Sequence, residues 1–353
     1  MAVTGPRRSG PVASGSPSLL PEANREGGID AEWAGDDQQW WDWYVTLAEN
    51  PSLHAPLTDG PGLPAVPAAT DRVVREALAE PYVLTDEQVA TFRDEAFVKL
   101  PGVLTPAVVR RLAERLQQLL VGEHGDDTAG RFTALEQMWV RDDLMREVAL
   151  SPRLGALAAE LLGEDAVRIY HDNALSKEPG CGRTPWHHDA EHFPIASTQA
   201  VTAWIPVSAI PGPMGPLAFA RGTGLRPLLE GLEFDKIGTT YDVEVARRFA
   251  AHGVAVQDGG YAVGEVSFHS SLCFHTAGPN RTTQPRRALA TTYFADGVRV
   301  VDNPTMISGA WRDFLPGVEP GGLAVSRLNP IVGRRSAPED LPDRAGPPRA
   351  CRP

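Results

Sequence analysis

Cysteine is scarce in this chain: Cys181, Cys273 and Cys351 are the only three among 353 residues. Thiols at such distant positions do not form the spacings of a disulfide framework, nor the closely spaced pairs of a structural zinc site. We therefore expect a fold that is held together by a hydrophobic core, which a chain of this length can bury in one domain.

Positive charge is also in short supply. Lysine and arginine total 33 against 45 aspartates and glutamates, which makes the formal net charge -12. Such an excess of negative charge disfavours nucleic acid or an anionic membrane surface as a partner. Long apolar runs are missing, and the first residues lack the charged-then-apolar order of a signal peptide. These absences predict a cytoplasmic protein that binds neither nucleic acid nor membrane.

Both ends of the chain contain little that a core could bury. Residues 1–28 are rich in Gly, Pro, Ser and Arg, and residues 336–353 in Pro, Arg and Asp, so both are predicted to be disordered. Residues 29–70 combine an aromatic-rich helix with a Pro-rich linker. The main domain is predicted to span residues 71–335.

The aromatic-rich helix has a distinct face. Trp40, Trp43, Tyr44 and Leu47 follow the i, i+3, i+4, i+7 spacing that places side chains on one side of a helix. This face either packs on the protein's own core or serves as a substrate lid or a dimer contact.

Three further helices are predicted by their first residues. Thr85 and Gln88 form a capping-box pattern. Thr105 precedes a proline at the first helical turn, and Ser151 is the third expected N-cap. Leucine-rich stripes follow Thr105 and Ser151, so these helices can brace one face of a sheet.

From Ala166 onward, short β-rich runs alternate with Gly/Pro turns, which is typical of an all-β sandwich or jelly roll. Residues 225–252 interrupt this pattern. Residues 243–251 are expected to be helical, with Asp242 as the N-cap. The pattern as a whole predicts a mainly β fold with flanking helices.

Two short motifs carry metal-ligand residues. Residues 186–189 read Trp-His-His-Asp, and His275 begins the block His-Thr-Ala-Gly-Pro-Asn. Alternate residues of a strand share a face, so His187 and Asp189 can point inward while His188 points away. Two imidazoles and one carboxylate on one side of a metal leave three positions open, as in non-haem Fe(II) oxygenases.

Two other histidines lie near these motifs. His269 has the same strand parity as His275, but six residues of extended strand would separate them by about 20 Å. A role behind the ligands or in the pocket is therefore expected for His269. His192 follows the first motif and either lines the pocket or packs in the core.

These segments also resemble a known family. The resemblance rests, in order, on residues 97–104 (FVKLPGVL), 185–194 (PWHHDAEHFP), 203–207 (AWIPV), 215–217 (GPL), 264–265 (GE) and 275–280 (HTAGPN). They are similar to the phytanoyl-CoA dioxygenase family over about residues 85–296. The family often has Gly-Ser-His after the Gly-Pro-Leu strand, whereas this chain has Arg-Gly-Thr-Gly at 221–224. This departure bears on the substrate more than on the chemistry.

The resemblance implies a fold and a set of cofactors. Members are double-stranded β-helix (jelly roll, cupin-like) oxygenases that use Fe(II), O2 and 2-oxoglutarate. It assigns metal binding to His187, Asp189 and His275, and the distal carboxylate of 2-oxoglutarate to Arg286. An arginine suits that carboxylate because its planar fork donates two charge-assisted hydrogen bonds. Further co-substrate contacts are expected from Asn173, Lys177, Trp204 and Gln137, whereas Arg287 should face the other way.

The implied reaction is hydroxylation of an unactivated C–H bond of a small molecule in bacterial secondary metabolism, by a monomer or homodimer. Desaturation, cyclisation and epoxidation use the same cofactors and stay open. A cupin-type metal protein that does not use 2-oxoglutarate is a further alternative, although it would not need Arg286. Halogenation is disfavoured because related halogenases lack the acidic ligand, and Asp189 is present.

Overall fold

The computed structural model describes residues 31–44, 56–232 and 239–335. The ends predicted to be disordered, 1–28 and 336–353, lie outside these ranges, as does part of the predicted linker. Elements from α3 to β11 occupy residues 71–334, and the domain limits at 71 and 335 stay predictions. Within the described ranges, no helix is long and apolar enough to cross a membrane.

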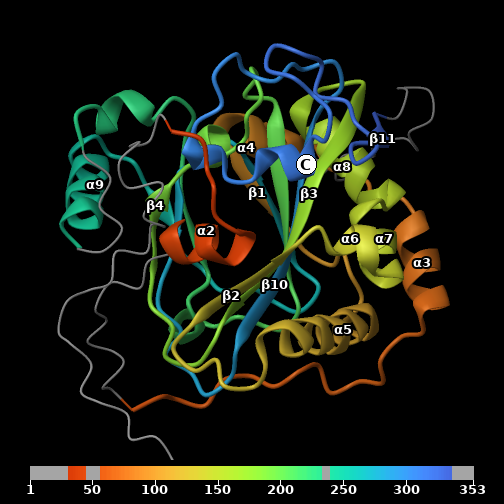
Figure 1. Ribbon diagram of the computed structural model, residues 1–353. Helices are drawn as coiled ribbons and strands as arrows, with labels where there is room; N and C mark the ends of the chain where they lie inside the picture. Colours follow the sequence, from red (N-terminus) through yellow and green to blue (C-terminus); the bar gives the residue numbers. More distant parts are fainter. Residues whose placement is uncertain (1–30, 45–55, 233–238, 336–353) are drawn as a thin grey trace, which may run out of the picture.

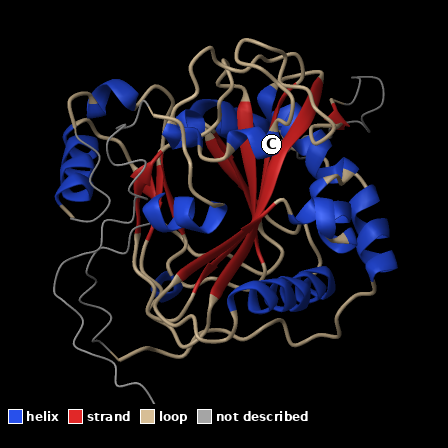
Figure 2. Ribbon diagram, in the orientation of Figure 1, coloured by secondary structure: helices blue, strands red, loops and turns tan. Residues whose placement is uncertain are grey.

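Two antiparallel sheets form the centre of the molecule (Figure 2). Their strands are β1 (Phe97–Leu100), β2 (Phe132–Glu136), β3 (Ala166–Lys177), β4 (Thr184–His187), β5 (Ala200–Pro206), β6 (Leu217–Ala220), β7 (Val256–Gln257), β8 (Val266–Ser270), β9 (His275–Ala277), β10 (Arg286–Ala295) and β11 (Ile331–Arg334). The large sheet has the order β1-β8-β5-β10-β3-β11, with β2 also paired to β3, and the small sheet has the order β4-β9-β6-β7. This is the predicted mainly β jelly roll with flanking helices.

Helices surround the sheets (Figure 1). They are α2 (Asp37–Tyr44), α3 (Asp71–Ala79), α4 (Asp86–Glu95), α5 (Pro106–His124), α6 (Met138–Arg141), α7 (Asp143–Ala149), α8 (Pro152–Leu162), α9 (Thr240–Ala251) and α10 (Trp311–Phe314). Short 3-10 turns are η3 (Asp189–Glu191), η4 (Gly212–Met214), η5 (Arg226–Leu229) and η6 (Met306–Ser308). Helices α3 and α5 to α8 lie on one side of the large sheet, and α9 lies beyond the small sheet.

The large sheet uses its two faces differently. Ile169, Leu289 and Tyr293 belong to a buried cluster with the leucines and valines of α3, α5 and α8, so this face forms the main core. The alternate residues of the same strands point between the two sheets. Burial of the outer face therefore fixes which side chains face the space between the sheets.

The predicted helix starts are confirmed. Thr85 and Gln88 form a reciprocal capping box at α4. Thr105 caps α5, with a proline in its first turn, and Ser151 caps α8. Each cap satisfies backbone N–H groups that have no partner within the helix.

The prediction for the insertion needs a correction. Helix α9 begins at Thr240, and its N-cap residue is Thr239 rather than Asp242. Asp242 lies in the first turn, where its carboxylate accepts a hydrogen bond from the Trp186 backbone N–H at 2.9 Å and pairs with Arg183 at 2.8 Å. Its side chain thus attaches α9 to β4 instead of capping the helix.

Helix α8 and strand β11 approach each other through two glycines. A Cβ added at Gly155 would lie 2.7 Å from the backbone nitrogen of Gly333, closer than real Cβ contacts. Gly122 in α5 offers a contrast, because no atom lies within 4 Å of a Cβ added there. Two glycines within helices therefore differ only in their surroundings.

We predict opposite effects of alanine at these two positions. Gly155→Ala should lower the free energy of unfolding by about 1–3 kcal/mol, because α8 must move away from β11. Gly122→Ala should raise it by up to about 1 kcal/mol, because alanine is the better helix former. Denaturant unfolding of both variants measures the difference, and shifts of the same sign would contradict the close approach.

Candidate active site

A cavity of about 970 Å³, including its open mouth, lies between the two sheets. Ligand pockets of small-molecule enzymes have this size and are mainly apolar with a few polar groups. The cavity is lined by Trp40, Trp41, Phe132, Glu136, Tyr170, His171, Asn173, Leu175, Thr184, His187, Asp189, His192, Phe193, Thr202, Trp204, Leu217, His269, His275, Arg286, Ala290, Thr292, Ser308, Gly309, Ala310 and Phe314.

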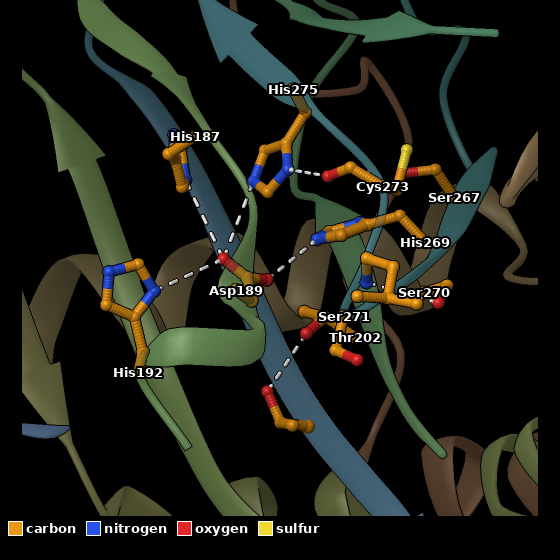
Figure 3. A network of polar contacts seen from close by, with 12 residues as sticks. His187, Asp189, His192, Thr202, Ser267, His269, Ser270, Ser271, Cys273 and His275 are labelled. Atoms are coloured by element: carbon orange, nitrogen blue, oxygen red, sulfur yellow. Dashed lines mark hydrogen bonds and ion pairs between the residues drawn. The ribbon is translucent and has the colours of Figure 1, made fainter. Parts of the chain in front are cut away.

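The three predicted metal ligands meet on the cavity wall (Figure 3). One ligand atom each of His187, Asp189 and His275 lies within 4.8 Å of the other two. Asp189 Oδ1 is 3.7 Å from His187 Nε2 and 3.8 Å from His275 Nε2. Two nitrogens and one carboxylate oxygen at these separations are a suitable set for a divalent metal ion.

Local structure brings these residues together. His187 and His275 are direct partners in the β4–β9 ladder. Strand β4 ends at His187, and Asp189 begins the turn η3, so the expected alternation along one strand is not what orients Asp189. His188 does face away, with its ring 4.9 Å from that of Phe274.

The two ligand imidazoles are oriented by backbone carbonyls. His187 Nδ1 is 2.8 Å from Pro185 O, and His275 Nδ1 is 3.0 Å from Cys273 O. These contacts direct each Nε2 toward Asp189, as is usual for metal-binding histidines. Burial lowers the pKa of His275 to about 4 and that of His187 well below its usual value, so both imidazoles are neutral at pH 7.

Asp189 is the ionised member of the set. Burial opposes its ionisation, but contacts with His275, His192 and His269 outweigh burial and hold its pKa well below the usual range. Neutral imidazoles and an ionised carboxylate are the protonation states that a divalent metal requires.

His269 is closer to the site than the sequence suggested. The chain turns between β8 and β9, so the rings of His269 and His275 lie 4.6 Å apart, not about 20 Å. His269 Nε2 is 3.4 Å from Asp189 Oδ2. The expectation of an extended strand was wrong, although the expected role behind the ligands fits this contact. The polar Ser270-Ser271 pair was the available signal for a turn.

Arg286 lies in the same cavity, at the first residue of β10. It is 2% exposed, and its guanidinium carbon lies 5.2 Å above the Trp204 ring. Its Nε and Nη1 have no hydrogen-bond partner among the described residues. Burial lowers its pKa to about 10, so the group remains a cation at pH 7.

The other predicted co-substrate residues fall into two groups. Asn173 and Trp204 line the cavity, as expected. Lys177 lies behind the wall, where its ammonium group donates to the carbonyls of Gly182, Ala277 and Gly278. Gln137 donates to the Asp313 carbonyl at 2.8 Å. Neither Lys177 nor Gln137 is among the lining residues, because each side chain bonds to backbone elsewhere.

Sequence reasoning missed a second part of the wall. Glu136 and Phe132 come from β2, and Tyr170 and His171 come from β3. The pairing of β3 with β10 shifts register between Thr292 and Tyr293, which lets the consecutive residues Tyr170 and His171 both reach the cavity. The alternation of side chains along β2 could have indicated that Phe132 and Glu136 share one face of the strand. The register shift between β3 and β10 has no recognisable pattern in the sequence.

The aromatic helix covers this side of the cavity. Trp40 and Trp41 of α2 line it, with the Trp40 ring 5.7 Å from that of His192. The Gln38 amide bonds to the backbone of Phe132 and Ala134 in β2. The predicted face is therefore tested only at Trp40, since the side chains of Trp43 and Tyr44 and all of Leu47 lie outside the described residues. His192 proves to line the cavity.

We predict that Asp242 protects the backbone beside the metal ligands. Asp242→Ala should speed hydrogen exchange at the Trp186 amide by about tenfold or more, because a part-buried N–H loses its acceptor. Glu244→Ala is the matched control, because Glu244 lies on the same helix and its ion pairs among the described residues are with Arg247 and Arg248. NMR measures the rate of hydrogen exchange at the Trp186 amide in both variants. Equal rates would rule out the attachment of α9 to β4 through Asp242.

Comparison with known proteins indicates the family to which this chain belongs. A family model, phytanoyl-CoA dioxygenase (PhyH), matches residues 92–288, more than half of the chain. Methylphosphonate hydroxylase of Gimesia maris is 28% identical over 60% of this chain and 81% of its own. The 2-oxoglutarate-dependent (alpha ketoglutarate-dependent) epimerase SnoN from nogalamycin biosynthesis is 26% identical, covering 70% of this chain and 98% of its own with a TM-score of 0.57. One of its structures contains Fe3+, alpha ketoglutarate and nogalamycin RO.

A second enzyme of nogalamycin biosynthesis shares the fold. The carbocyclase SnoK matches 72% of this chain and 99% of its own, with 21% identity and a TM-score of 0.59. The family match, together with a cavity that holds a His-Asp-His group, gives the class of the protein. The chain belongs to the phytanoyl-CoA dioxygenase family and is an oxygenase that depends on Fe(II), 2-oxoglutarate and O2.

Proposed function

We propose that this enzyme hydroxylates an unactivated C–H bond of a small molecule in bacterial secondary metabolism. In this proposal His187, Asp189 and His275 hold Fe(II), and Arg286 binds the distal carboxylate of 2-oxoglutarate. The observation that carries it is the buried Arg286 guanidinium, whose Nε and Nη1 lack partners among the described residues, in the cavity that contains the His-Asp-His group.

The residues present fit the metal. Both histidines present a neutral Nε2, and Asp189 provides the anion that partly compensates a divalent charge. When bound, Fe(II) with 2-oxoglutarate and O2 supplies the oxidising power for C–H cleavage. His269 and His192 contact the Asp189 carboxylate from other sides and hold it in place.

The residues also fit the co-substrate. A buried guanidinium without an acidic partner is costly, and a bidentate carboxylate offsets that cost. Trp204 stacks near the guanidinium, and Asn173 presents an amide on the same inner face. A cupin-type metal protein that does not use 2-oxoglutarate would leave this arginine without a function.

The relatives support a small-molecule substrate and leave the outcome of the reaction open. The Gimesia maris relative is a hydroxylase, and SnoN is an epimerase of a biosynthetic pathway. Hydroxylation is the outcome we propose, with desaturation, cyclisation and epoxidation as alternatives from the same site. A cytoplasmic monomer or homodimer completes the proposal.

Removal of a metal ligand should abolish iron binding without unfolding the protein. We expect His187→Ala, Asp189→Ala and His275→Ala to lose iron and turnover, because two ligands do not hold the ion, while the core of the sheets is untouched. His252→Ala, on the exposed end of α9, is the control. Metal analysis measures the iron content of each variant, and circular dichroism shows whether it is folded. Normal iron content in the His275 variant would transfer its role to His269.

If Arg286 binds 2-oxoglutarate, substitutions of Arg286 and Arg287 should lower the affinity for 2-oxoglutarate to different degrees. Arg286→Ala should weaken 2-oxoglutarate binding by about a hundredfold or more, since loss of one partner of a buried ion pair costs about 3–5 kcal/mol. Lysine should recover part of the affinity, because it offers charge without the fork. Arg287→Ala is the control, as Arg287 faces the other way and contacts Gln117. The apparent affinity for 2-oxoglutarate is measured from succinate formation in each variant. An unchanged affinity in the Arg286→Ala variant would refute binding of 2-oxoglutarate at this site.

A further inference from the structure

One buried hydroxyl group in the cavity wall lacks a hydrogen bond. Tyr170 is 3% exposed, and its Oη bonds to no other atom within the described parts of the chain. A buried tyrosine hydroxyl usually has a partner, because an unpaired polar group in the interior costs free energy. Tyr170 lines the cavity, so a bound molecule can supply the missing partner.

The strand geometry directs this side chain into the cavity. The residues on either side of Tyr170 pair with two consecutive residues of β10, so Tyr170 itself has no partner in that strand. Such a β-bulge redirects side chains and is common next to active sites. The neighbouring His171 pairs with Thr292, about 20 Å of extended strand away from Arg286. Tyr170 therefore belongs to the part of the cavity that the arginine does not reach.

Aromatic rings surround the Tyr170 phenol. Its ring centroid lies 5.2 Å from that of Phe193 and 5.4 Å from that of Phe314, and both of these residues line the cavity. The His171 ring lies 4.9 Å from that of Phe314. Aromatic side chains at such distances hold other flat rings by stacked and edge-to-face contacts. This part of the wall is therefore suited to a ring-containing ligand.

The aromatic group adjoins the metal site. Phe193 directly follows His192, whose Nδ1 lies 3.8 Å from Asp189 Oδ1 (Figure 3). The Trp40 ring lies on the other side of His192, with ring centroids 5.7 Å apart. A ring held against Phe193 thus lies beside the metal ligands, where a substrate must be placed for oxidation.

The groups around Tyr170 favour an uncharged ligand. Burial raises the pKa of Tyr170 well above its usual value and lowers that of His171 to about 3, so at pH 7 one is a phenol and the other a neutral imidazole. Among the described lining residues, Arg286 is the one lysine or arginine, and the proposed function assigns it to 2-oxoglutarate. A charged group would leave water for a wall of neutral rings, which is costly.

We propose that Tyr170, Phe193 and Phe314 form a subsite for an uncharged aromatic ring of the substrate, which carries a hydroxyl or carbonyl oxygen. The Tyr170 hydroxyl donates to that oxygen, and the two phenylalanines hold the ring. The inference rests on the proposed function, because it takes the bound ring to be the molecule that is oxidised at the metal. Phe314 lies outside residues 92–288, which the family model matches, so this subsite is not supplied by the matched region alone.

Three probes with the same ring system test the charge preference: 2-naphthalenemethanol, 2-naphthylmethylamine and 2-naphthoate. Calorimetry on the protein loaded with Fe(II) and excess 2-oxoglutarate, without oxygen, measures their affinities. The alcohol should bind about tenfold or more tightly than the other two, because each of these must bury a charge. The amine also tests whether Glu136, whose Oε1 lies 3.5 Å from His171 Nδ1, attracts a cation to this part of the cavity.

Two substitutions test the proposed contacts. Tyr170→Phe should weaken binding of the alcohol about threefold to tenfold, the contribution of one neutral hydrogen bond. Phe314→Leu should weaken it by a similar factor, because an aromatic contact is lost. Tyr82→Phe is the control for the first change, since the Tyr82 hydroxyl donates to the Pro101 carbonyl and Tyr82 does not line the cavity. Phe92→Leu, in the main core, is the control for the second.

The outcomes separate this inference from the proposed function. An amine or naphthoate that binds as tightly as the alcohol, or absence of alcohol binding at millimolar concentration, would overturn the subsite. So would a loss in either variant no larger than in its control. If Phe314→Leu does not fold, the order of the probes and the Tyr170→Phe result decide. The visible charge-transfer band of the 2-oxoglutarate complex is recorded before each probe is added. Its absence refutes the proposed function, whereas its presence beside a failed probe order refutes the aromatic subsite alone.

Discussion

The site depends on one carboxylate held inside the protein. Asp189 lies 3.4–3.8 Å from nitrogen atoms of four histidines, two from the small sheet, one from β8 of the large sheet and one from the end of η3. An anion without partners would be very unfavourable in such an interior. Because its contacts come from both sheets, its position depends on how the sheets close on each other. The geometry of the metal site therefore depends on the closure of the jelly roll.

Part of this arrangement could be predicted from the sequence, for reasons that differ between residues. His187, Asp189 and His275 were identifiable because ligand chemistry restricts residue types and spacing. The opposite directions of Arg286 and Arg287 followed from the alternation of a regular strand, and β10 is regular at that end. The distance from His269 to His275 could not be obtained in this way, because a tight turn replaces the extended strand that the argument assumed. Lys177 shows a further limit, since its bonding partners lie in loops distant in sequence.

The aromatic helix illustrates what pattern alone leaves undecided. Periodicity predicted a helix around Trp40, and α2 is present, but Trp41 also faces the cavity. The reason is a tertiary contact: β2 is an edge strand with free backbone groups, and the Gln38 amide bonds to two of them. With α2 held on β2 in this way, both Trp40 and Trp41 line the cavity. Nothing in residues 37–44 alone specifies the partner strand.

The two ends of the cavity are built from different kinds of structure. The metal and arginine end is formed by paired strands, where the hydrogen-bond ladder fixes each side chain in position. The opposite end combines a register shift at Tyr170, the end of β2 and the short helix α10. A regular ladder allows little change without disturbing the core, whereas turns, shifts and docked helices accept different side chains at small cost. The chemistry of the family is thus supported by the rigid part of this fold, and the choice of substrate is expected from its irregular part.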